Sequence, residues 1–562
     1  MFNEVLFGAV DVLAAVGIGS ALACWLRISP GLGERGILGL IGVACAGAVT
    51  QLFFPLSGPV PILLGALGIL FAIVFRRQIQ DSSTWPALIS LAAGFVAVAW
   101  VWRSAPLFYD DGLYYLQTIK WMRQFPLTLG LANLHGRLGF NSQDFVLLAT
   151  LPAGSSSWVA RSVLSGLVMA SFVQRLDGLR DATPWRPEVF WYAAMAPLVF
   201  VTNPVHELSG PDLLCVALIA YWFLIALQVS PGADGSTTDY ALLVIIGTFA
   251  PTVKLSAAPV LALTLLGCAL AWRSGWVQMR VLGLSAFLFG VWLLRGVLLS
   301  GCALYPVRQS CIFVLPWAVR PEQVTWYTIA IQSWARRPDV FDYHAVLGSW
   351  DWFRPWFSTA LKEPILQFGV AGAITFSLST LGLFRDSSRH FRAYALAGFL
   401  AVCITWWFFS APDVRFGAGF LISFGLLGFS LLASLALPAP YSLRHGSVVL
   451  SAVAVVAGIH AVVAAAPLQT SAPPVVESYE LRTPSEPRVW IPQKGELCWD
   501  HALPCSPYIH VDSWRRIWWP RSLPTFPESS FSAPPEWIGY EAEDSRRRPA
   551  MGVPPKRKGP VR

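Results

Sequence analysis

The chain has 562 residues, of which 55% are hydrophobic and only 13% are charged, and its mean hydropathy is +0.55. This composition excludes a soluble multidomain protein and indicates a polytopic membrane protein; the 26 tryptophans fit that class, because indole rings favour the membrane–water interface. The formal charge of +8 does not indicate nucleic-acid binding, because the basic residues are scattered through short loops and a proline-rich tail.

Apolar runs of membrane length predict an all-α fold with about fourteen transmembrane helices. The first run is expected to be a helix rather than a cleaved signal, because no positively charged segment precedes it. Several runs are shorter than the roughly 20 residues of a full crossing, so they are expected to extend into flanking residues or to be broken. The runs lie near residues 5–26, 37–54, 60–75, 86–102, 155–174, 188–202, 212–229, 240–253, 257–271, 281–299, 364–384, 394–410, 416–437 and 447–466.

The arginine and lysine residues predict how these helices are oriented. Alternate connections contain most of the arginines, whereas the short connections between them contain only Lys254 and Arg415. By the positive-inside rule the arginine-rich connections are cytoplasmic. The external face, which is periplasmic for a bacterial plasma (inner) membrane, then contains both termini, the loops 103–143 and 300–363 and the segment from 467. The arginines of the cytoplasmic set are Arg27, Arg35, Arg76, Arg77, Arg175, Arg180, Arg186, Arg273, Arg280, Arg385, Arg389, Arg392 and Arg444.

Residues 103–143 form the one long polar interruption in the first half of the chain and hold two adjacent acids, Asp110 and Asp111. Apolar residues recur after them at helical spacing, which predicts an amphipathic helix on the membrane surface with an acid at its N-terminal end. One Asp could cap that helix, which leaves the other for chemistry. Polar groups clustered at the mouth of a membrane helix indicate function, and a solvated loop with ordinary capping residues is the alternative. The loop also holds His135, Arg137 and Asn141.

Two further external connections hold candidate residues. The turn TNPVHELSGPDLL offers His206 and Asp212, although Asp212 is also a typical helix-start residue. The segment PTVKLSAAP splits an apolar run into two short helices, with Lys254 near the break. The Lys254 amine either reaches back to the membrane surface or binds an anion in a cavity, and the short helices and paired prolines favour the anion.

Two arginines near the external ends of apolar helices are further candidates. Arg295 lies inside an apolar run, where a guanidinium is costly unless it meets a phosphate or forms a structural ion pair with another helix. The segment APDVRFG places Asp413 and Arg415 between two apolar helices. These two residues either neutralise each other or contribute to a phosphate site, because a phosphate needs donors that converge from several helices.

Four of the nine cysteines lie in polar segments at short spacing and predict two local disulfides, Cys302 with Cys311 and Cys498 with Cys505, if those segments are external. A metal site is the alternative, and no histidine follows either pair at finger-like spacing. Residues 300–363 are expected to form interfacial helices that cover a site. From residue 467 the composition predicts a small disulfide-pinned unit and, over 520–562, a disordered basic tail.

The many helices, the acidic first loop and the external C-terminal segment resemble the GT-C superfamily, integral membrane glycosyltransferases that use polyprenyl-phosphate-linked sugars. The segments YDDGLYYLQTIKW, NLHGRLGFNS, APDVRFG and CWDHALPC also resemble a largely uncharacterised group of bacterial polytopic proteins that is usually placed near this superfamily. GT-C enzymes usually place the acidic loop directly after their first helix. In this chain, three helices precede the helix that leads into the acidic loop. The expected division is therefore N-terminal helices (1–85) added to a GT-C-like core (86–466), followed by an external segment (467–562).

The GT-C resemblance implies an inverting glycosyltransferase that moves a sugar from a polyprenyl-phosphate donor to a hydroxyl of a glycan, lipid or protein. The acid of that superfamily aligns with Asp110 or Asp111, and Asp110 is favoured as general base. The expected phosphate ligands are Lys254, Arg295 and Arg415, and the expected ligands of sugar hydroxyls or phosphate are His135, Arg137 and Asn141.

The resemblance implies no fixed cofactor, because some GT-C enzymes use a divalent metal ion and others do not. Two other classes of function remain open. A transporter or flippase of a lipid-linked sugar would explain many helices with buried cations, but it does not need long, Trp-rich external segments. A polymerase or ligase of surface polysaccharide also keeps arginines in external loops and needs no cofactor.

Overall fold

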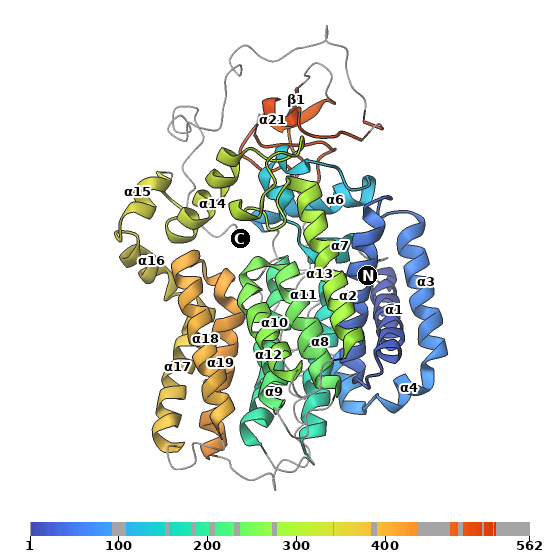
Figure 1. Cartoon of the computed structure of the whole chain (residues 1–562), viewed down its shortest axis with the longest axis vertical. Coiled ribbons are helices and arrows are strands. Elements are labelled where there is room, and N and C mark those ends of the chain that lie inside the picture. Colours follow the sequence, from blue (N-terminus) through green and yellow to red (C-terminus); the bar gives the residue numbers. More distant parts are fainter. Residues whose placement is uncertain are drawn as a thin grey trace.

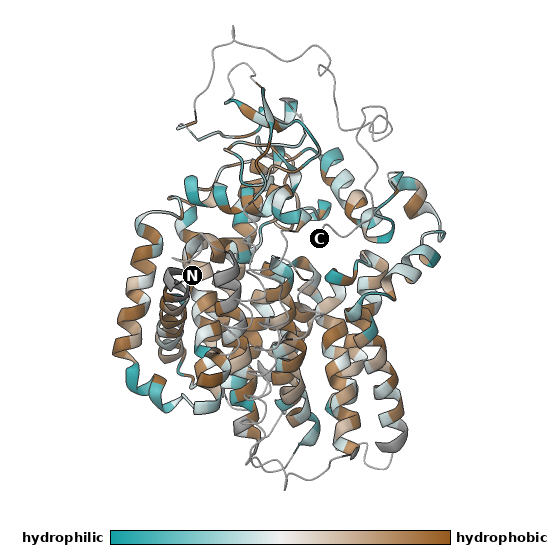
Figure 2. Cartoon of the chain, turned by 180° about the vertical axis from the view of Figure 1, so that it is seen from behind, coloured by the Kyte–Doolittle hydropathy of each residue, from teal (hydrophilic) through white to brown (hydrophobic). Residues whose placement is uncertain are grey.

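The computed structural model describes residues 2–92, 108–151, 157–180, 186–201, 208, 210–229, 237–272, 278–340, 342–383, 390–436, 473–481, 487–508, 511–520 and 522–523. These residues are mostly helical and form a bundle with a cap at one end (Figure 1). Apolar residues run along the bundle, whereas polar residues gather in the cap and at the opposite end of the bundle (Figure 2). This separation is the one expected of a chain that spans a membrane.

Among the described residues, six helices are long and apolar enough to cross a membrane, so the protein is a mostly helical membrane protein, as the predicted all-α class requires apart from two short strands. They are α1 (Phe2–Leu26), α2 (Leu32–Gln51), α10 (Pro211–Gln228), α13 (Met279–Ser300), α18 (Phe391–Ser410) and α19 (Val414–Ala436). Shorter apolar stretches occupy α3 (Pro59–Val74), part of α8 (Ser157–Arg180), α11 (Thr237–Val253), α12 (Ala258–Trp272) and α17 (Pro364–Leu383).

The predicted number of about fourteen spans is therefore not reached in the part of the chain that the structure describes. The shorter apolar helices contain only 10–17 residues of suitable composition, fewer than the roughly 20 of a full crossing. Lys254 lies at one such interruption: α11 ends at Val253, a 3-10 turn follows at Leu255–Ala257, and α12 starts at Ala258. The predicted break at PTVKLSAAP is thus confirmed. The run near 447–466 and most of the run near 86–102 lie outside the described residues.

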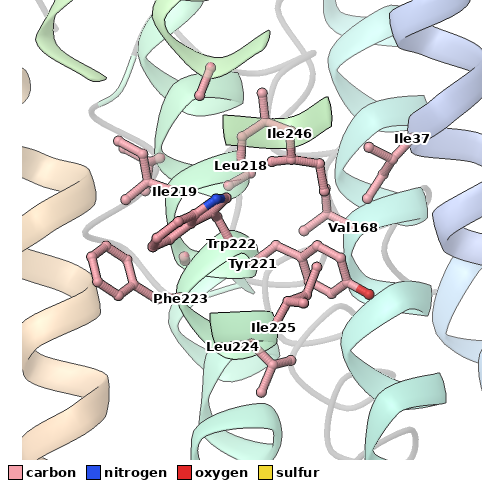
Figure 3. Close-up of a cluster of buried hydrophobic side chains, with 14 of the residues drawn as sticks. Ile37, Val168, Leu218, Ile219, Tyr221, Trp222, Phe223, Leu224, Ile225 and Ile246 are labelled. Carbon is pink, nitrogen blue, oxygen red and sulfur yellow. The ribbon is translucent and has the colours of Figure 1, made fainter. Parts of the chain in front are cut away.

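Helix α10 forms the centre of the bundle and packs against α8, α9 (Pro187–Val201), α11 and α19. Its apolar span is 89% buried, whereas the spans of α13 and α18 are 33% and 28% buried. Helix α10 is therefore shielded on all sides, and α13 and α18 lie on the perimeter. Tyr221, Trp222 and Phe223 of α10 fill the core together with Ile37 of α2 and Ile246 of α11 (Figure 3). The N-terminal helices thus share one core with the rest of the bundle.

The described parts of the arginine-rich connections lie at the end of the bundle away from the cap, where α4 (Arg76–Asp81) also lies (Figure 1). Arg175 contacts the carboxylates of Glu34 and Asp239, each at 2.5 Å. At the start of α13, Arg280 donates to the carbonyl of Trp25 at 2.6 Å. Connections that are distant in sequence therefore meet at the same end, as the alternation of charged connections predicts.

The cap combines the two long loops with the C-terminal segment (Figure 1). The first loop forms the π-helix η1 (Asp111–Tyr115), which continues as α6 (Leu116–Gln124), followed by η2 (Leu131–Asn133), η3 (Gly136–Gly139) and α7 (Gln143–Thr150). The second loop forms η6 (Arg308–Ser310), α14 (Pro321–Arg336), α15 (Tyr343–Gly348) and α16 (Phe353–Ala360). The C-terminal segment contributes the antiparallel strands β1 (Ser478–Leu481) and β2 (Val489–Pro492) and the short helix α21 (Val511–Trp514).

The predicted surface helix of the first loop forms, but the structure covers it. Gln117, Trp121 and Met122 of α6 are buried, and Lys120 contacts the carboxylate of Asp500 in the C-terminal segment at 2.9 Å. Part of this helix is therefore packed against other parts of the chain, and its place on the membrane surface stays a prediction. Helical periodicity identifies an apolar face, but it cannot distinguish a lipid surface from another part of the same chain.

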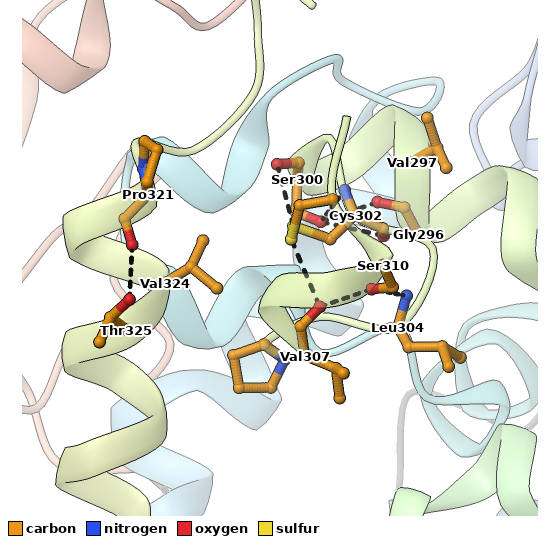
Figure 4. The surroundings of a disulfide bond; sticks show 12 residues. Gly296, Val297, Ser300, Cys302, Leu304, Val307, Ser310, Pro321, Val324 and Thr325 are labelled. Carbon is orange, nitrogen blue, oxygen red and sulfur yellow. Dashed lines mark hydrogen bonds between the residues drawn. A yellow bond between two sulfur atoms is a disulfide. The ribbon is translucent and has the colours of Figure 1, made fainter. Parts of the chain in front are cut away.

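Both predicted disulfides are confirmed, with S–S distances of 2.01 Å for Cys302–Cys311 and 2.02 Å for Cys498–Cys505. The first closes the loop that follows α13, and Ser310 Oγ in that loop donates to the carbonyl of Val307 at 2.7 Å (Figure 4). The second closes a loop of the C-terminal segment that lies on η1 and α6.

Candidate functional site

An acidic turn at residues 108–111 leads into η1 and contains both predicted catalytic acids. The buried Asp111 carboxylate accepts a hydrogen bond from the backbone N–H of Phe108 at 2.9 Å, which closes the turn. Asp110 accepts hydrogen bonds from two guanidinium groups outside the turn. The two neighbouring acids therefore have different surroundings: Asp111 caps the turn, and Asp110 faces cations.

Asp110 lies between arginines from two distant elements. Its Oδ1 is 2.9 Å from Nη1 of Arg137, and its Oδ2 is 3.2 Å from Nη1 of Arg415. Arg137 belongs to η3 in the cap, and Arg415 to the first turn of α19 in the bundle. The Asp110 carboxylate therefore joins cap and bundle through one charge-assisted hydrogen bond on each oxygen.

Arg415 also pairs with Asp413, its near neighbour in APDVRFG. The Nη2 to Oδ2 distance is 3.3 Å, and the Arg415 backbone N–H donates to Asp413 Oδ1 at 2.9 Å. Asp413 thus caps the start of α19 and partly neutralises Arg415. The Arg415 guanidinium lies 5.5 Å from the ring centroid of Trp334, which places α14 of the cap beside it.

A second ion pair lies beside the first. The Lys254 ammonium contacts the carboxylate of Asp212 in the first turn of α10 and lies 4.4 Å from the ring centroid of Phe416. Asp212 is also close enough to act electrostatically on Arg415 and on Tyr115 of η1. The two ion-paired groups form one cluster, here called the Asp110 cluster, which consists of Asp110, Arg137, Asp212, Lys254, Asp413 and Arg415.

The Asp110 cluster is electrically balanced and partly accessible, since its three carboxylates oppose three cations. The side chains of Lys254, Arg415 and Arg137 are 21%, 27% and 31% exposed, whereas that of Asp212 is 1% exposed. An anionic ligand can therefore reach these cations, but it must compete with the carboxylates that already hold them.

The groups around Arg137 keep it charged. Burial alone would lower the pKa of Arg137, but the Asp110 carboxylate and neighbouring phenols outweigh this effect and raise the pKa above its usual value. Burial also raises the pKa of Tyr114 well above its usual range and that of Tyr327 to about 12. The Arg137 guanidinium lies 5.6 Å from the Tyr114 ring centroid. Near neutral pH the site therefore presents a cation flanked by uncharged phenols.

A family model described as "Domain of unknown function (DUF8201)" matches residues 5–422. The chain belongs to the DUF8201 family. No curated protein and no protein of solved structure matches it. The DUF8201 match contains the whole Asp110 cluster and runs through residue 85, where the sequence predicts a boundary. It ends within α19, so the C-terminal segment that covers α6 lies outside the DUF8201 match.

Arg295 and Asn141 of the DUF8201 domain form a different, buried contact. Arg295 Nε donates to Asn141 Oδ1 at 3.2 Å, Arg295 Nη1 donates to Gln51 Oε1, and Asn141 Nδ2 donates to the carbonyl of Trp292 at 2.6 Å. A cavity of about 10 Å³ beside Arg295 has room for roughly one water molecule. These contacts link the first loop to α2 and α13, and they do not bring Arg295 or Asn141 to Asp110.

Of the two predicted histidines, His135 belongs to the part of the chain that the structure describes. His135 is buried, and its ring centroid lies 5.3 Å from that of Tyr508 in the C-terminal segment. His206 lies outside the described residues. Within the described ranges, no group of three His, Cys, Asp or Glu side chains is arranged to hold a metal ion.

The sequence did not predict the aromatic residues around the cations of the Asp110 cluster. Phe416 packs on Lys254, Trp334 on Arg415 and Tyr114 on Arg137. Tyr114 lies in the quoted segment YDDGLYYLQTIKW, and Phe416 directly follows Arg415, so their proximity to charged residues is visible in the sequence. No sequence signal links Trp334 to Arg415, because the two belong to elements that meet only in the folded chain.

Proposed function

We propose that this protein is an inverting membrane glycosyltransferase of the GT-C kind, which moves a sugar from a polyprenyl-phosphate donor to an acceptor hydroxyl. The observation that supports this proposal is the position of Asp110 between Arg137 and Arg415, with Lys254 beside them. Sugar transfer from a lipid phosphate requires a base for the acceptor and cations for the leaving phosphate. The Asp110 cluster contains both at the capped end of an apolar bundle.

In the proposed reaction, an acceptor oxygen attacks the anomeric carbon from the face opposite the phosphate. Asp110 takes the hydroxyl proton as the new carbon–oxygen bond forms. The bond from the anomeric carbon to the phosphate oxygen breaks, and its electron pair leaves with the lipid phosphate. Arg415 and Lys254 stabilise the negative charge that develops on this leaving group, and Arg137 keeps Asp110 oriented.

Donor binding also prepares the base in this scheme. Without a donor, one guanidinium occupies each oxygen of Asp110. A donor phosphate that recruits Arg415 removes the hydrogen bond to Oδ2, and this oxygen can then accept the proton. The exchange keeps Arg415 paired throughout, so no uncompensated charge remains in the partly buried site.

We assign the Asp110 cluster to the external face of a bacterial plasma membrane, with both chain termini on that side. The assignment follows from the positive-inside rule, because the arginine-rich connections meet at the opposite end of the bundle. We also assign the shorter apolar helices, α9 and the runs near 86–102 and 447–466 to the membrane, which together with the six long helices gives about fourteen crossings.

Transfer by the full-length protein in proteoliposomes tests this function, with a panel of radiolabelled sugars linked to polyprenyl phosphate and added glycan, lipid and peptide acceptors. We expect one donor to yield a product of inverted anomeric configuration. Arg415→Gln should weaken binding of that donor at least about tenfold, which corresponds to the loss of one charged hydrogen bond. Absence of transfer from every donor would contradict the proposal.

A transporter or flippase of a lipid-linked sugar is the second candidate, favoured by the Lys254–Asp212 pair at a broken helix. The same proteoliposomes distinguish the two, because a flippase moves the labelled donor across the bilayer without releasing its sugar. Transfer that persists without lipid movement supports the transferase, and lipid movement without transfer supports the flippase. A surface-polysaccharide polymerase or ligase would instead extend or transfer a preformed chain.

A further inference from the structure

The loop at residues 496–508, closed by the Cys498–Cys505 disulfide, lies on η1, which directly follows the acidic turn, and β1 and α21 of the same segment lie above α6 (Figure 1). The backbone N–H of Trp499 donates to the carbonyl of Gly112 at 2.8 Å. Gln117 Nε2 donates to the carbonyls of Trp499 and His501, both at 3.0 Å. Residues that follow Asp110 and Asp111 are therefore joined to the disulfide loop by hydrogen bonds to the backbone of that loop.

Gly112 and Trp499 fit each other closely. A Cβ atom on Gly112 would lie 2.7 Å from ring atoms of Trp499, so only glycine leaves room for the indole. Trp499 has a φ of 45°, a left-handed conformation that is unfavourable for a bulky residue and persists only where surrounding contacts enforce it. The disulfide, the two Gln117 bonds and the Gly112 contact supply such enforcement.

The same loop also reaches the second half of the first external loop. Ser506 Oγ donates to the carbonyl of Leu134 at 2.9 Å, and Tyr508 packs beside His135, two residues before Arg137. The disulfide loop thus contacts the segments that carry Asp110 and Arg137 at once. The Lys120–Asp500 ion pair adds little, because the Asp500 side chain is 61% exposed.

The acidic turn needs external support because of its local structure. Residues 111–115 form a π-helix, which is rare and less favourable than the α-helix into which it continues. Asp110 lies at the start of this segment, and its two arginine contacts have distances of only 2.9 and 3.2 Å. A shift of about 1 Å in η1 would break them, and misplacements of that size can lower a catalytic rate about 100-fold.

We propose that the disulfide loop at residues 496–508 is a positioning element for Asp110, with Trp499 as its central positioning residue. This inference rests on the proposed function of Asp110 as general base. Trp499 acts through its contacts with Gly112 and η1, which keep Asp110 between Arg137 and Arg415. Sugar transfer therefore depends on the Cys498–Cys505 disulfide and on a segment outside the DUF8201 match.

The test compares Trp499→Ala, Trp499→Phe and the double variant Cys498→Ser/Cys505→Ser in the full-length protein in proteoliposomes. Two quantities are measured: steady-state transfer from a polyprenyl-phosphate sugar, and backbone hydrogen exchange of residues 108–118. We expect Trp499→Ala and the double serine variant to lower kcat about 10- to 100-fold, leave KM for the donor within about twofold, and speed the exchange. Trp499→Phe, which keeps an aromatic ring over Gly112, should restore most of kcat.

A matched control is Cys302→Ser/Cys311→Ser, which removes the other disulfide of the cap and should leave exchange of residues 108–118 unchanged. Gly112→Ala should reproduce the loss of Trp499→Ala, and combining the two should lower kcat no further, because both act through one contact. Wild-type kcat and exchange in Trp499→Ala would overturn this inference alone. Absence of transfer by the unaltered protein would overturn the proposed function itself, whatever the exchange shows.

Discussion

The two ion-paired groups of the Asp110 cluster depend on partners from distant elements. Asp110 is held by Arg137 and Arg415, and Lys254 is held by Asp212. Removing one member of such a pair is more damaging than removing both, because the remaining charge is left without compensation in a poorly hydrated site. The residues differ in this respect according to their burial: Asp212 is 1% exposed and Lys254 is 21% exposed.

Lys254→Met therefore should destabilise the protein more than the double change Asp212→Asn/Lys254→Met. The single variant leaves the buried Asp212 carboxylate without its paired ammonium group, which should lower the free energy of unfolding by about 3 kcal/mol. The double variant removes both charges and should recover most of that loss. Thermal unfolding in detergent gives the comparison, and equal destabilisation in the single and double variants would show that the pair is not coupled.

Stability at alkaline pH should depend on Tyr327, which accepts a hydrogen bond from the Gly136 backbone N–H at 2.9 Å. Burial raises the pKa of Tyr327 to about 12, above its value near 10 in an unfolded chain. The contribution of the uncharged Tyr327 side chain to the free energy of unfolding is therefore complete below pH 10, and it is lost as the pH rises from 10 to 12. Tyr327→Phe removes this ionisation. Over that pH window, the free energy of unfolding of the variant should therefore fall less steeply than that of the unaltered protein, by at most about 1.4 kcal/mol per pH unit. An unchanged slope in denaturant titrations at pH 10–12 would contradict this account.

At the scale of elements, α16 lies where the cap meets the bundle (Figure 1). Phe353 and Phe357 of α16 and the nearby Trp350 are 39%, 45% and 61% exposed. Phe353 packs on Phe408 near the cap end of the perimeter helix α18, with ring centroids 6.1 Å apart. Exposed aromatic side chains at the end of a membrane helix are typical of the interfacial zone, so α16 is expected to lie along the membrane surface.

A photoreactive phenylalanine analogue at position 353 should therefore cross-link to lipid when the protein is reconstituted and irradiated. The matched control is the same analogue at Val475, which is 97% exposed but belongs to the C-terminal segment of the cap. Mass spectrometry of the adducts provides the measurement. Equal lipid labelling at both positions would mean that α16 has no special relation to the bilayer.

At the scale of the whole molecule, the sequence predicted membrane class, both disulfides and the break at Lys254, because composition, cysteine spacing and proline positions report local structure directly. It also predicted the clustering of arginines at one end. The GT-C resemblance, rather than any local pattern, placed Asp110 and Arg415 in one site, because the two are joined only by tertiary packing. Neither the pattern nor the resemblance predicted that Trp499 covers Gly112. The partners of Arg295 could not be predicted for a related reason: an arginine in an apolar helix suggests an anion or an ion pair, and its partners in the structure are the side-chain amides of Gln51 and Asn141.

The orientation of the whole molecule is tested by labelling single introduced cysteines with a membrane-impermeant maleimide. Val475→Cys in the cap should react in intact spheroplasts, whereas Gln78→Cys in α4, an exposed position at the opposite end, should react only after permeabilisation. The unaltered protein provides the background from its native cysteines. Labelling in the reverse order would place the Asp110 cluster in the cytoplasm and contradict the assigned face.

The central claim, that Asp110 is the base of a sugar transfer, is tested most directly by comparing Asp110→Asn with Asp111→Asn in proteoliposomes. The account predicts that Asp110→Asn lowers kcat at saturating donor by at least about 100-fold while donor binding stays within about threefold. Asp111→Asn, which affects the turn-closing contact with Phe108, should retain substantially more activity. Transfer by Asp110→Asn at the wild-type rate would contradict the account.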